Sequence, residues 1–275
     1  MRLRILYLRG LMIAVLALSV SSNIAFAGPF EDGVAAVERN DYATAVRLWR
    51  PLAEQNNVRA QYFLGLAYYE GVGVAQDFKE AANWFGLAAA QGHAIAQYNL
   101  GQMYREEKGV IKDFKEAVKW YRLAAAQGLM AAQYSLGMAY YQGVGVAQDF
   151  KEGVKWYGLA AEQGDADAQY TLGQMHRQGQ GVVQDFKEAA KWYRLAAEQG
   201  SALAQYNLGV IYAKGRGVAQ NFMRAHMWLD VAEKNGNVDA ARNLNVISRL
   251  LTAQQIAKAQ AMARKCQASN YKQCD

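Results

Sequence analysis

Residues 57–92 read NVRAQYFLGLAYYEGVGVAQDFKEAANWFGLAAAQG, and this stretch decides the fold. Its tripeptide Ala-Gln-Tyr returns every 36 residues, beginning at Ala60, Ala96, Ala132, Ala168 and Ala204, and a diverged Ala-Ala-Arg begins at Ala240. A fixed period of this length indicates one helical unit stacked many times. The sequence therefore predicts an all-α solenoid of 36-residue helix-turn-helix repeats, with a long surface that favours binding over catalysis.

Each repeat is expected to contain two helices. Apolar side chains recur at helical spacing from Val58 to Tyr69, which predicts a first helix, helix A. Gly71-Val72-Gly73-Val74 ends it, because glycine readily takes the left-handed backbone that terminates a helix. Asp77 and Glu80 then form the pattern of a capping box at the start of helix B, which stops at Gln91-Gly92. The same pair recurs as Asp113 and Glu116, Asp149 and Glu152, and Asp185 and Glu188, and weakens to Asn221 and Arg224.

Tryptophan keeps the same period in helix B. Five tryptophans each lie 24 residues after the alanine of an Ala-Gln-Tyr: Trp84, Trp120, Trp156, Trp192 and Trp228. Because they recur at one position of the repeat, we predict that they form the core. Trp49 is the exception, since it precedes Ala60 by 11 residues where the later tryptophans precede the next alanine by 12. We attribute this spacing, which is shorter by one residue, to Pro51. We expect Pro51 to kink the helix that contains Trp49, so that the first helix pair packs at an altered angle.

Three positions depart from the repeat. Glu107 occupies the first loop-glycine position, which predicts a turn strained by about 1 kcal/mol. His176 replaces the helix A tyrosine. Gly153 replaces a helix B alanine, at a cost of about 1 kcal/mol in helix propensity.

The chain divides into four segments: a signal peptide at 1–27, an N-terminal capping helix pair at 28–56, five repeats at 57–236, and C-terminal capping helices with a tail at 237–275. The first pair is predicted at Phe30 to Arg39 and Asp41 to Gln55, and the closing pair at Val238 to Leu251 and Thr252 to Lys265. Thr252 with Gln255 forms a capping box.

The first 27 residues have the pattern of a secretory signal peptide. Arg2, Arg4 and Arg9 precede a short apolar run, and Ala25-Phe26-Ala27 is a cleavage motif. The apolar run is shorter than the ~20 residues that a membrane span needs, and no later stretch qualifies. We expect cleavage between Ala27 and Gly28 and a periplasmic or secreted monomer without a transmembrane segment.

Charge and cysteine content narrow the function classes. Removing those three arginines leaves 27 basic against 24 acidic residues, a net charge of +3, and the signs alternate along each repeat. Nucleic acid is therefore not an expected partner. The two cysteines, Cys266 and Cys274, both lie in the tail. Export to an oxidising compartment favours a disulfide between them over free thiols or an intermolecular bridge.

These residues resemble the Sel-like repeat family, a relative of the tetratricopeptide repeats. Its pattern of Ala-Gln-Tyr-x-Leu-Gly, Tyr-x-x-Gly-x-Gly-Val, Asp, Ala-x-x-Trp-x-x-x-Ala-Ala and Gln-Gly runs through residues 57–236 in five copies. The resemblance implies antiparallel helix pairs that wind into a right-handed superhelix. It also implies an adaptor that mediates protein complexes, in signalling, in envelope homeostasis or in contact with a host.

No constellation of residues points to catalysis or to a cofactor or metal. The three histidines, His93, His176 and His226, fit no metal-ligand spacing, and a structural or surface role is favoured for each. The alternative is a periplasmic hydrolase of the β-lactamase or penicillin-binding type, as reported for cysteine-rich Sel-like repeat proteins. This chain lacks cysteines inside its repeats, which departs from that pattern. A spacer without a specific ligand is a third interpretation.

One stripe of helix A is predicted to face solvent and line a concave groove. It holds Phe63, Leu66, Glu70, Asn99, Gln102, Glu106, Ser135, Met138, Gln142, Thr171, Gln174, Gln178, Asn207, Val210 and Lys214. Amides at one-repeat intervals suit the backbone of an extended peptide. The residues flanking the stripe, Tyr69, Arg105, Tyr141 and Arg177, suit acidic or aromatic groups. A merely solvated face is the alternative. We predict a protein or peptide partner bound by Tyr69, Asn99, Gln102, Arg105, Ser135, Met138, Tyr141, Thr171, Gln174, Arg177 and Asn207.

Overall fold

The computed structural model describes residues 28–274, and all its regular elements are helices. The signal-peptide prediction for 1–27 lies outside the described residues. The chain forms two compact units, which meet in sequence between Asp113 and Phe114. The first unit contains α2 (Pro29–Glu38), α3 (Tyr42–Glu54), α4 (Val58–Glu70), α5 (Phe78–Ala90) and α6 (Ala94–Glu106).

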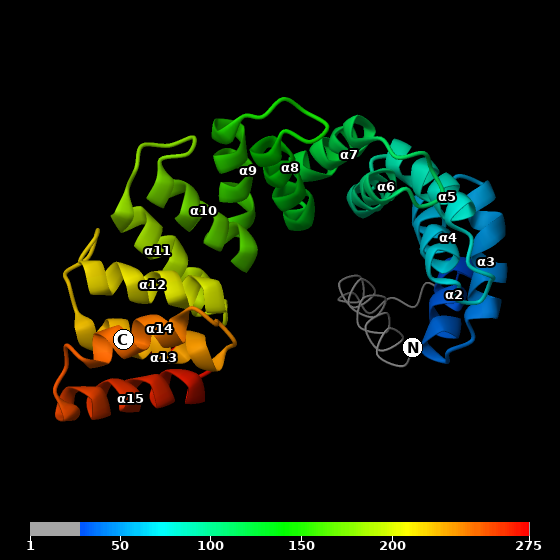
Figure 1. Ribbon diagram of the computed structural model, residues 1–275. Coiled ribbons are helices and arrows are strands. Elements are labelled where there is room, and N and C mark those ends of the chain that lie inside the picture. The colour runs from blue at the N-terminus through cyan, green and yellow to red at the C-terminus, as the bar shows by residue number, and fades with distance from the viewer. Residues whose placement is uncertain (1–27, 275) are drawn as a thin grey trace. The chain divides into compact units, whose positions relative to one another are not determined.

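The second unit continues the same alternation. It contains α7 (Phe114–Ala126), α8 (Met130–Gln142), α9 (Phe150–Glu162), α10 (Ala166–Gln178), α11 (Phe186–Ala197), α12 (Ala202–Lys214), α13 (Phe222–Lys234), α14 (Ala240–Ser248) and α15 (Ala253–Ala268). From α2 to α6 and from α7 to α14, each helix packs against the next in its unit (Figure 1). The fold is an all-α repeat solenoid, as the period predicts. Helix A corresponds to α4, α6, α8, α10 and α12, and helix B to α5, α7, α9, α11 and α13.

The loops and caps follow local sequence rules. Gly71 ends α4 in the left-handed region, and Glu107 ends α6 at φ +58°, the unusual backbone expected of that substitution. Asp77 Oδ1 accepts the amide hydrogens of Lys79 and Glu80 at 2.9 and 3.1 Å. The amide of Asp77 itself donates to the Tyr68 carbonyl rather than to a glutamate, so only half of the predicted capping box forms. The box of α15, between Thr252 and Gln255, is complete.

In four of the five B helices the core aromatic is not the tryptophan but the residue after it, which corrects the prediction for those four; only Trp228 is buried as predicted. The buried side chains are Phe85, Tyr121, Tyr157, Tyr193 and Leu229, whereas Trp84, Trp120, Trp156 and Trp192 are half-buried at the edge. Helix A makes room with a glycine: a Cβ at Gly65 would lie 2.5 Å from the ring of Phe85. The buried aromatic of helix B and the glycine of helix A are therefore a packed pair.

Trp49 belongs to this buried set, so the explanation by a missing residue is wrong. It precedes Ala60 by 11 residues, just as Phe85 precedes Ala96, and it is 1% exposed. Its ring stacks on Phe30 and Phe63, and its indole Nε1 donates to the Phe30 carbonyl. The helix α3 continues through Pro51 to Glu54. The first helix pair thus keeps the register of a full repeat.

A ladder of buried glutamines also joins consecutive helix pairs. The glutamine of Ala-Gln-Tyr donates from Nε2 to the carbonyl eight residues earlier, as Gln169 does to Ala161 at 3.0 Å. Its Oε1 accepts from an amide 30 residues later, as Gln169 does from Gln199 at 2.8 Å. Members of the ladder are Gln61, Gln97, Gln133, Gln169 and Gln205, all buried. The ladder explains why both glutamines of the repeat recur.

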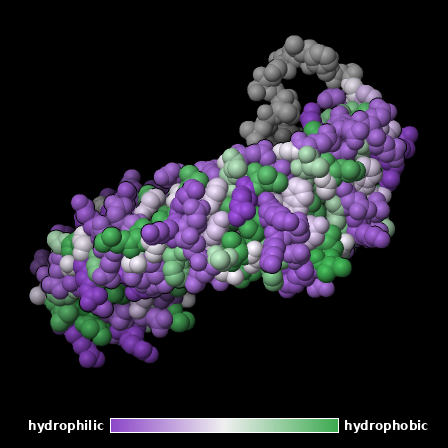
Figure 2. All heavy atoms as spheres, turned by 90° about the horizontal axis from the view of Figure 1, so that it is seen from above, coloured by the Kyte–Doolittle hydropathy of each residue, from purple (hydrophilic) through white to green (hydrophobic). Residues whose placement is uncertain are grey.

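The C-terminal helices close the second unit differently from the predicted pair. Both α14 and α15 pack against α13. As a result every residue from Ala225 to Ala232 is buried, and Trp228 is 0% exposed, unlike its counterparts. Cys266 at the end of α15 forms a disulfide with Cys274. None of the helices within residues 28–274 has the length and apolarity of a membrane span. Figure 2 shows hydrophilic and hydrophobic residues interspersed on one face of the molecule.

Candidate functional site

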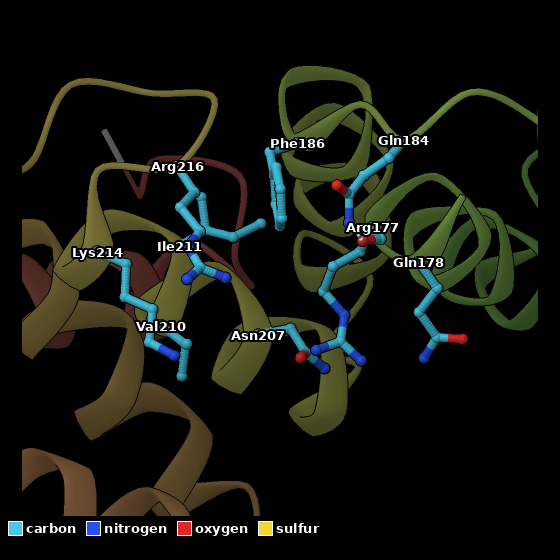
Figure 3. Close-up of a pocket in the computed structure, with 9 residues that line it drawn as sticks. All are labelled: Arg177, Gln178, Gln184, Phe186, Asn207, Val210, Ile211, Lys214 and Arg216. Atoms are coloured by element: carbon cyan, nitrogen blue, oxygen red, sulfur yellow. Dashed lines mark hydrogen bonds between the residues drawn. The ribbon is translucent and has the colours of Figure 1, made fainter. Parts of the chain in front are cut away.

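A pocket opens on the helix A side of each unit, between two consecutive A helices. In the first unit it has a volume of about 210 Å³ and lies between α4 and α6. In the second it has a volume of about 290 Å³ and lies between α10 and α12 (Figure 3). The first pocket is lined by Leu66, Tyr69, Glu70, Phe85, Asn99, Gln102 and Glu106. The second is lined by Arg177, Gln178, Gln184, Phe186, Asn207, Val210, Ile211, Lys214 and Arg216.

The pocket of the first unit carries acidic residues from the last turns of α4 and α6, Glu70 and Glu106. Lys108 Nζ pairs with Glu106 at 2.9 Å and donates to the Tyr69 hydroxyl at 2.7 Å. The hydrogen bond from Lys108 is the main cause that lowers the pKa of Glu106, and the bond to Tyr69 is the main cause that raises the pKa of Lys108. Lys108 therefore ties the loop after α6 back to the end of α4.

The pocket of the second unit is basic. Arg177 comes from the end of α10, Lys214 from the end of α12, and Arg216 from the following loop. The guanidinium of Arg216 lies 5.3 Å from the ring centroid of Phe186, the first residue of α11. Gln184 Nε2 donates to the Arg177 carbonyl at 2.8 Å. None of the nine residues drawn around this pocket is acidic (Figure 3).

The two pockets occupy the same places in the repeat but differ in side chains. The last residue of helix A changes along the chain, in the order Glu70, Glu106, Gln142, Gln178 and Lys214. The residue before it changes as well, in the order Tyr69, Arg105, Tyr141, Arg177 and Ala213. The glutamine of the buried ladder, by contrast, is the same in each of these repeats. Variation is therefore concentrated at the pockets rather than at the stacking contacts.

Five of the predicted binding residues line these pockets. Tyr69, Asn99 and Gln102 line the first, and Arg177 and Asn207 line the second. Several predicted amides already have partners: Gln102 Nε2 donates to the Tyr98 hydroxyl at 2.6 Å, and Asn207 Nδ2 donates to the Leu203 carbonyl at 2.8 Å. An amide side chain has an oxygen that can accept a hydrogen bond in addition to the nitrogen that donates one.

The remaining predicted residues lie elsewhere. Ser135 is buried, and Met138 and Tyr141 pack against the apolar cluster of the second unit. Phe63 and Leu66, placed on the open stripe, are buried too. The predicted solvent-facing position is wrong for Ser135, Phe63 and Leu66, because the stripe borders the helix interface. Met138 and Tyr141 are half-buried, and Leu66 still lines the first pocket. Three others bond within their own helix: Arg105 to Glu106, Thr171 to the Asp167 carbonyl, and Gln174 to the Tyr170 hydroxyl.

Sequence reasoning missed two loop residues: Arg216, which lines the second pocket, and Lys108, which bonds to Tyr69 and Glu106 of the first. Lys108 and Arg216 each lie in the turn after a helix A, which the repeat pattern marks only as a glycine loop. Phe186 was assigned to no role because it opens helix B. A signal was available, since Lys108 and Arg216 are charged where the equivalent loop residues of other repeats are Val72, Val144 and Gln180.

The histidines have structural surroundings. His93 Nδ1 accepts the Ala96 amide hydrogen at 3.2 Å and so caps α6, and its ring stacks on Tyr62. Burial lowers the pKa of His93, and burial is also the main cause that lowers the pKa of His226. Within residues 28–274, histidine, cysteine and carboxylate side chains form no group suited to a metal ion.

The comparisons with known proteins agree with the repeat architecture. The family model described as Sel1 repeat matches residues 27–57, 58–93, 94–129, 131–165, 166–201 and 202–237. The first of these matches is the helix pair that we expected to be only a cap. A comparison with curated proteins found no match.

Two solved structures are similar over most of this chain. One is a protective antigen of uropathogenic Escherichia coli with an SLR fold, at 36% identity and a TM-score of 0.77, covering 88% of this chain and 53% of that one. This chain therefore spans about half the length of that antigen. The other is a Sel1 repeat protein from Oxalobacter formigenes, at 34% identity and a TM-score of 0.74, covering 86% of this chain and 99% of that one.

Proposed function

Because the chain belongs to the Sel1 repeat family, whose members are commonly protein-interaction scaffolds, we propose that it binds extended segments of a partner protein on the helix A side of its repeats. The observation that carries this proposal is the pair of pockets at equivalent repeat positions, one in each unit. Their lining residues differ between repeats, whereas the residues that stack the helices recur. Variable pockets on a constant frame are what a recognition surface requires.

The size and polarity of the pockets suit side chains of a peptide better than a large ligand. Volumes of about 210 and 290 Å³ fall below the ~300 to 1,000 Å³ typical of small-molecule sites. Asn99 and Asn207 offer amide oxygens to a peptide backbone, one in each pocket.

An exported location is part of the proposal. It rests on the sequence of residues 1–27, in which a basic start, a short apolar run and Ala25-Phe26-Ala27 precede Gly28. A periplasmic or secreted scaffold of the cell envelope would meet its partner there. Mass spectrometry of the exported protein should find Gly28 at the amino terminus, and a mature protein that begins at Met1 would contradict the export proposal.

The hydrolase alternative finds no support. The Sel1 repeat family is generally a non-enzymatic scaffold. The residues around the two pockets include no serine, cysteine or histidine that could serve as a nucleophile or a base next to one. Their polar groups are amides, carboxylates and cations suited to binding.

A peptide selection tests the proposal. Linear peptides displayed on phage would be selected on the purified protein, and the affinity of the best binder measured by fluorescence anisotropy. Asn99→Ala combined with Asn207→Ala should weaken binding at least tenfold, since each lost hydrogen bond contributes about 1 kcal/mol. The helical circular dichroism should not change, because both side chains are only half-buried.

A matched pair of asparagines provides the control. Asn83 and Asn245 are exposed on α5 and α14, outside both pockets. Replacing both by alanine should leave the affinity within twofold. If no peptide is selected, or if all selected peptides bind the Asn99 and Asn207 double variant as tightly as the wild type, the proposed site is wrong.

A further inference from the structure

We propose that the pocket between α10 and α12 binds acidic side chains of the partner segment, with Arg177, Lys214 and Arg216 as the groups that recognise the carboxylates. The inference rests on the proposed function and adds the chemistry of the ligand to it. It concerns the second unit alone. Its first support is a contact between the end of helix A and the loop of the next repeat, which other repeats of the chain make.

In two of the repeats, a tyrosine near the end of helix A forms a hydrogen bond with a loop residue 39 positions later. Lys108 donates to the Tyr69 hydroxyl at 2.7 Å, and the Tyr141 hydroxyl donates to Gln180 Oε1 at 3.2 Å. Each pair is complementary, with a donor facing an acceptor. The contact ties the loop of one repeat to helix A of the repeat before it.

In the basic pocket this pairing position holds two arginines. Arg177 and Arg216 are also 39 residues apart and both line the pocket. Two guanidinium groups have donors but no acceptor, so they cannot form the hydrogen bond that joins Tyr69 to Lys108 and Tyr141 to Gln180. An anion between them would accept from both. Arg177 and Arg216 therefore cannot bond to each other as the equivalent residues do, and they need an acceptor from a ligand.

The geometry holds the cations in place for this role. Arg216 stacks over Phe186, which directs its guanidinium along the wall of the pocket (Figure 3). Arg177 Nε is buried and has no hydrogen-bond partner in the described part of the chain. Lys214 lies on the same side as Arg216, at the end of α12. Guanidinium groups favour planar two-oxygen ligands, and a carboxylate is such a ligand.

The described residues that line the pocket include no carboxylate. Gln178 occupies the repeat position that Glu70 occupies in the pocket of the first unit. The nearest acid in sequence, Asp185, caps α11 by accepting the amide hydrogens of Lys187 and Glu188. Those bonds lower the pKa of Asp185 and engage its carboxylate with the helix. Lys214 and Arg216 are exposed and available to a ligand, whereas Arg177 is half-buried and its charge also acts on the Tyr193 hydroxyl, where it opposes the rise in pKa that burial causes.

The neighbouring side chains favour a polypeptide as the source of the acid. Asn207, Gln178 and Gln184 place amide groups beside the cations, and Phe186 adds an apolar wall. Amides pair with peptide backbone, and an aromatic wall accommodates the methylene groups of a glutamate. The proposed ligand is accordingly an extended segment with acidic side chains at intervals.

Two synthetic peptides test this chemistry. One alternates serine and glutamate over ten residues, and the other replaces each glutamate by glutamine; both carry blocked ends and a fluorophore. At low ionic strength the glutamate peptide should bind the purified protein at least tenfold more tightly than the glutamine peptide. Its affinity should fall as salt increases, because surface charges are screened.

A pair of double variants locates the interaction. Lys214→Gln with Arg216→Gln removes two exposed cations of the pocket. Lys151→Gln with Lys258→Gln removes two exposed cations elsewhere in the second unit and changes the net charge equally. The first pair should weaken binding of the glutamate peptide about tenfold, and the second less than twofold. Thermal melting of both variants checks that the fold is kept.

Several outcomes would overturn the proposal. These are equal binding of the two peptides, an equal loss in the two double variants, or no binding of the glutamate peptide at all. Peptides from phage that depend on Asn99 and Asn207, yet lack acidic residues and ignore Lys214→Gln with Arg216→Gln, would refute this inference while leaving the proposed function intact. A failure of every peptide to bind would refute both.

Discussion

Replacing Gln169 by methionine tests whether the buried glutamine ladder stabilises the stack. Gln169 is 4% exposed and makes two hydrogen bonds, to the Ala161 carbonyl and from Gln199. Methionine has a similar volume, so little cavity is created. The Ala161 carbonyl still accepts the Gly164 amide hydrogen, and Gln199 Nε2 still donates to the Gly164 carbonyl. The loss is therefore two net hydrogen bonds, or about 1 to 3 kcal/mol, without a fully orphaned group.

Urea denaturation followed by circular dichroism measures this loss. The matched control is Gln142→Met, because Gln142 is exposed at the end of α8 and belongs to no ladder. The control should change the free energy of unfolding by less than about 0.5 kcal/mol. If Gln169→Met proves as stable as the control, the ladder does not hold consecutive repeats together and the reasoning from buried amides is wrong.

Five further substitutions test local features of the structure. Gly153→Ala should raise the free energy of unfolding by about 1 kcal/mol in urea, because the added Cβ meets its nearest neighbour at 3.5 Å and alanine favours the helix. Leu129→Asp should raise it by about 0.5 to 1 kcal/mol, because Leu129 is an N-cap without a side-chain bond. Tyr157→Ala should cost about 3 to 5 kcal/mol, and Trp156→Ala clearly less, because only Tyr157 is buried. The neutral imidazole of His93 caps α6, and the pKa of His93 in the folded protein lies below the ordinary 6.5. The cap should therefore contribute fully to the free energy of unfolding above about pH 6.5. This contribution should be lost as the pH falls through the lowered pKa of His93. The melting temperature of His93→Asn should therefore approach or exceed that of the wild type on acidification, and a constant difference from pH 7.5 to 5 would contradict the cap.

Much of the fold could be predicted because its signals are local. The period of Ala-Gln-Tyr, the left-handed turn at Gly71 and the cap at Asp77 are each set by a few adjacent residues, and the structure shows each of them. The phase of the core was missed because neighbouring positions such as Trp84 and Phe85 differ by only about 100° around a helix. Which of them is buried depends on the glycine of helix A opposite, a contact that no single helix reveals.

The candidate site could be predicted only in part, for a related reason. The stripe on helix A included Asn99 and Asn207, which line the two pockets, because positions on one face of a helix follow from the helical period. It could not show that Ser135 is buried, which depends on the neighbouring helices. It also omitted Arg216, because a loop residue that returns to the preceding repeat has no signature in the helical pattern.

Within one repeat, the residues that stack the helices are separate from the residues exposed at the end of helix A. The contacts that stack the helices, such as the glutamine ladder and the fit of Gly65 to Phe85, are made away from the exposed ends of helix A. Substitutions at those ends change few buried contacts, and surface changes of this kind usually alter stability by less than about 0.5 kcal/mol. The same frame can therefore carry Glu70 in one repeat and Lys214 in another. Recognition can change from repeat to repeat at little cost to the fold, which makes the ends of helix A the positions where partner specificity is most readily altered.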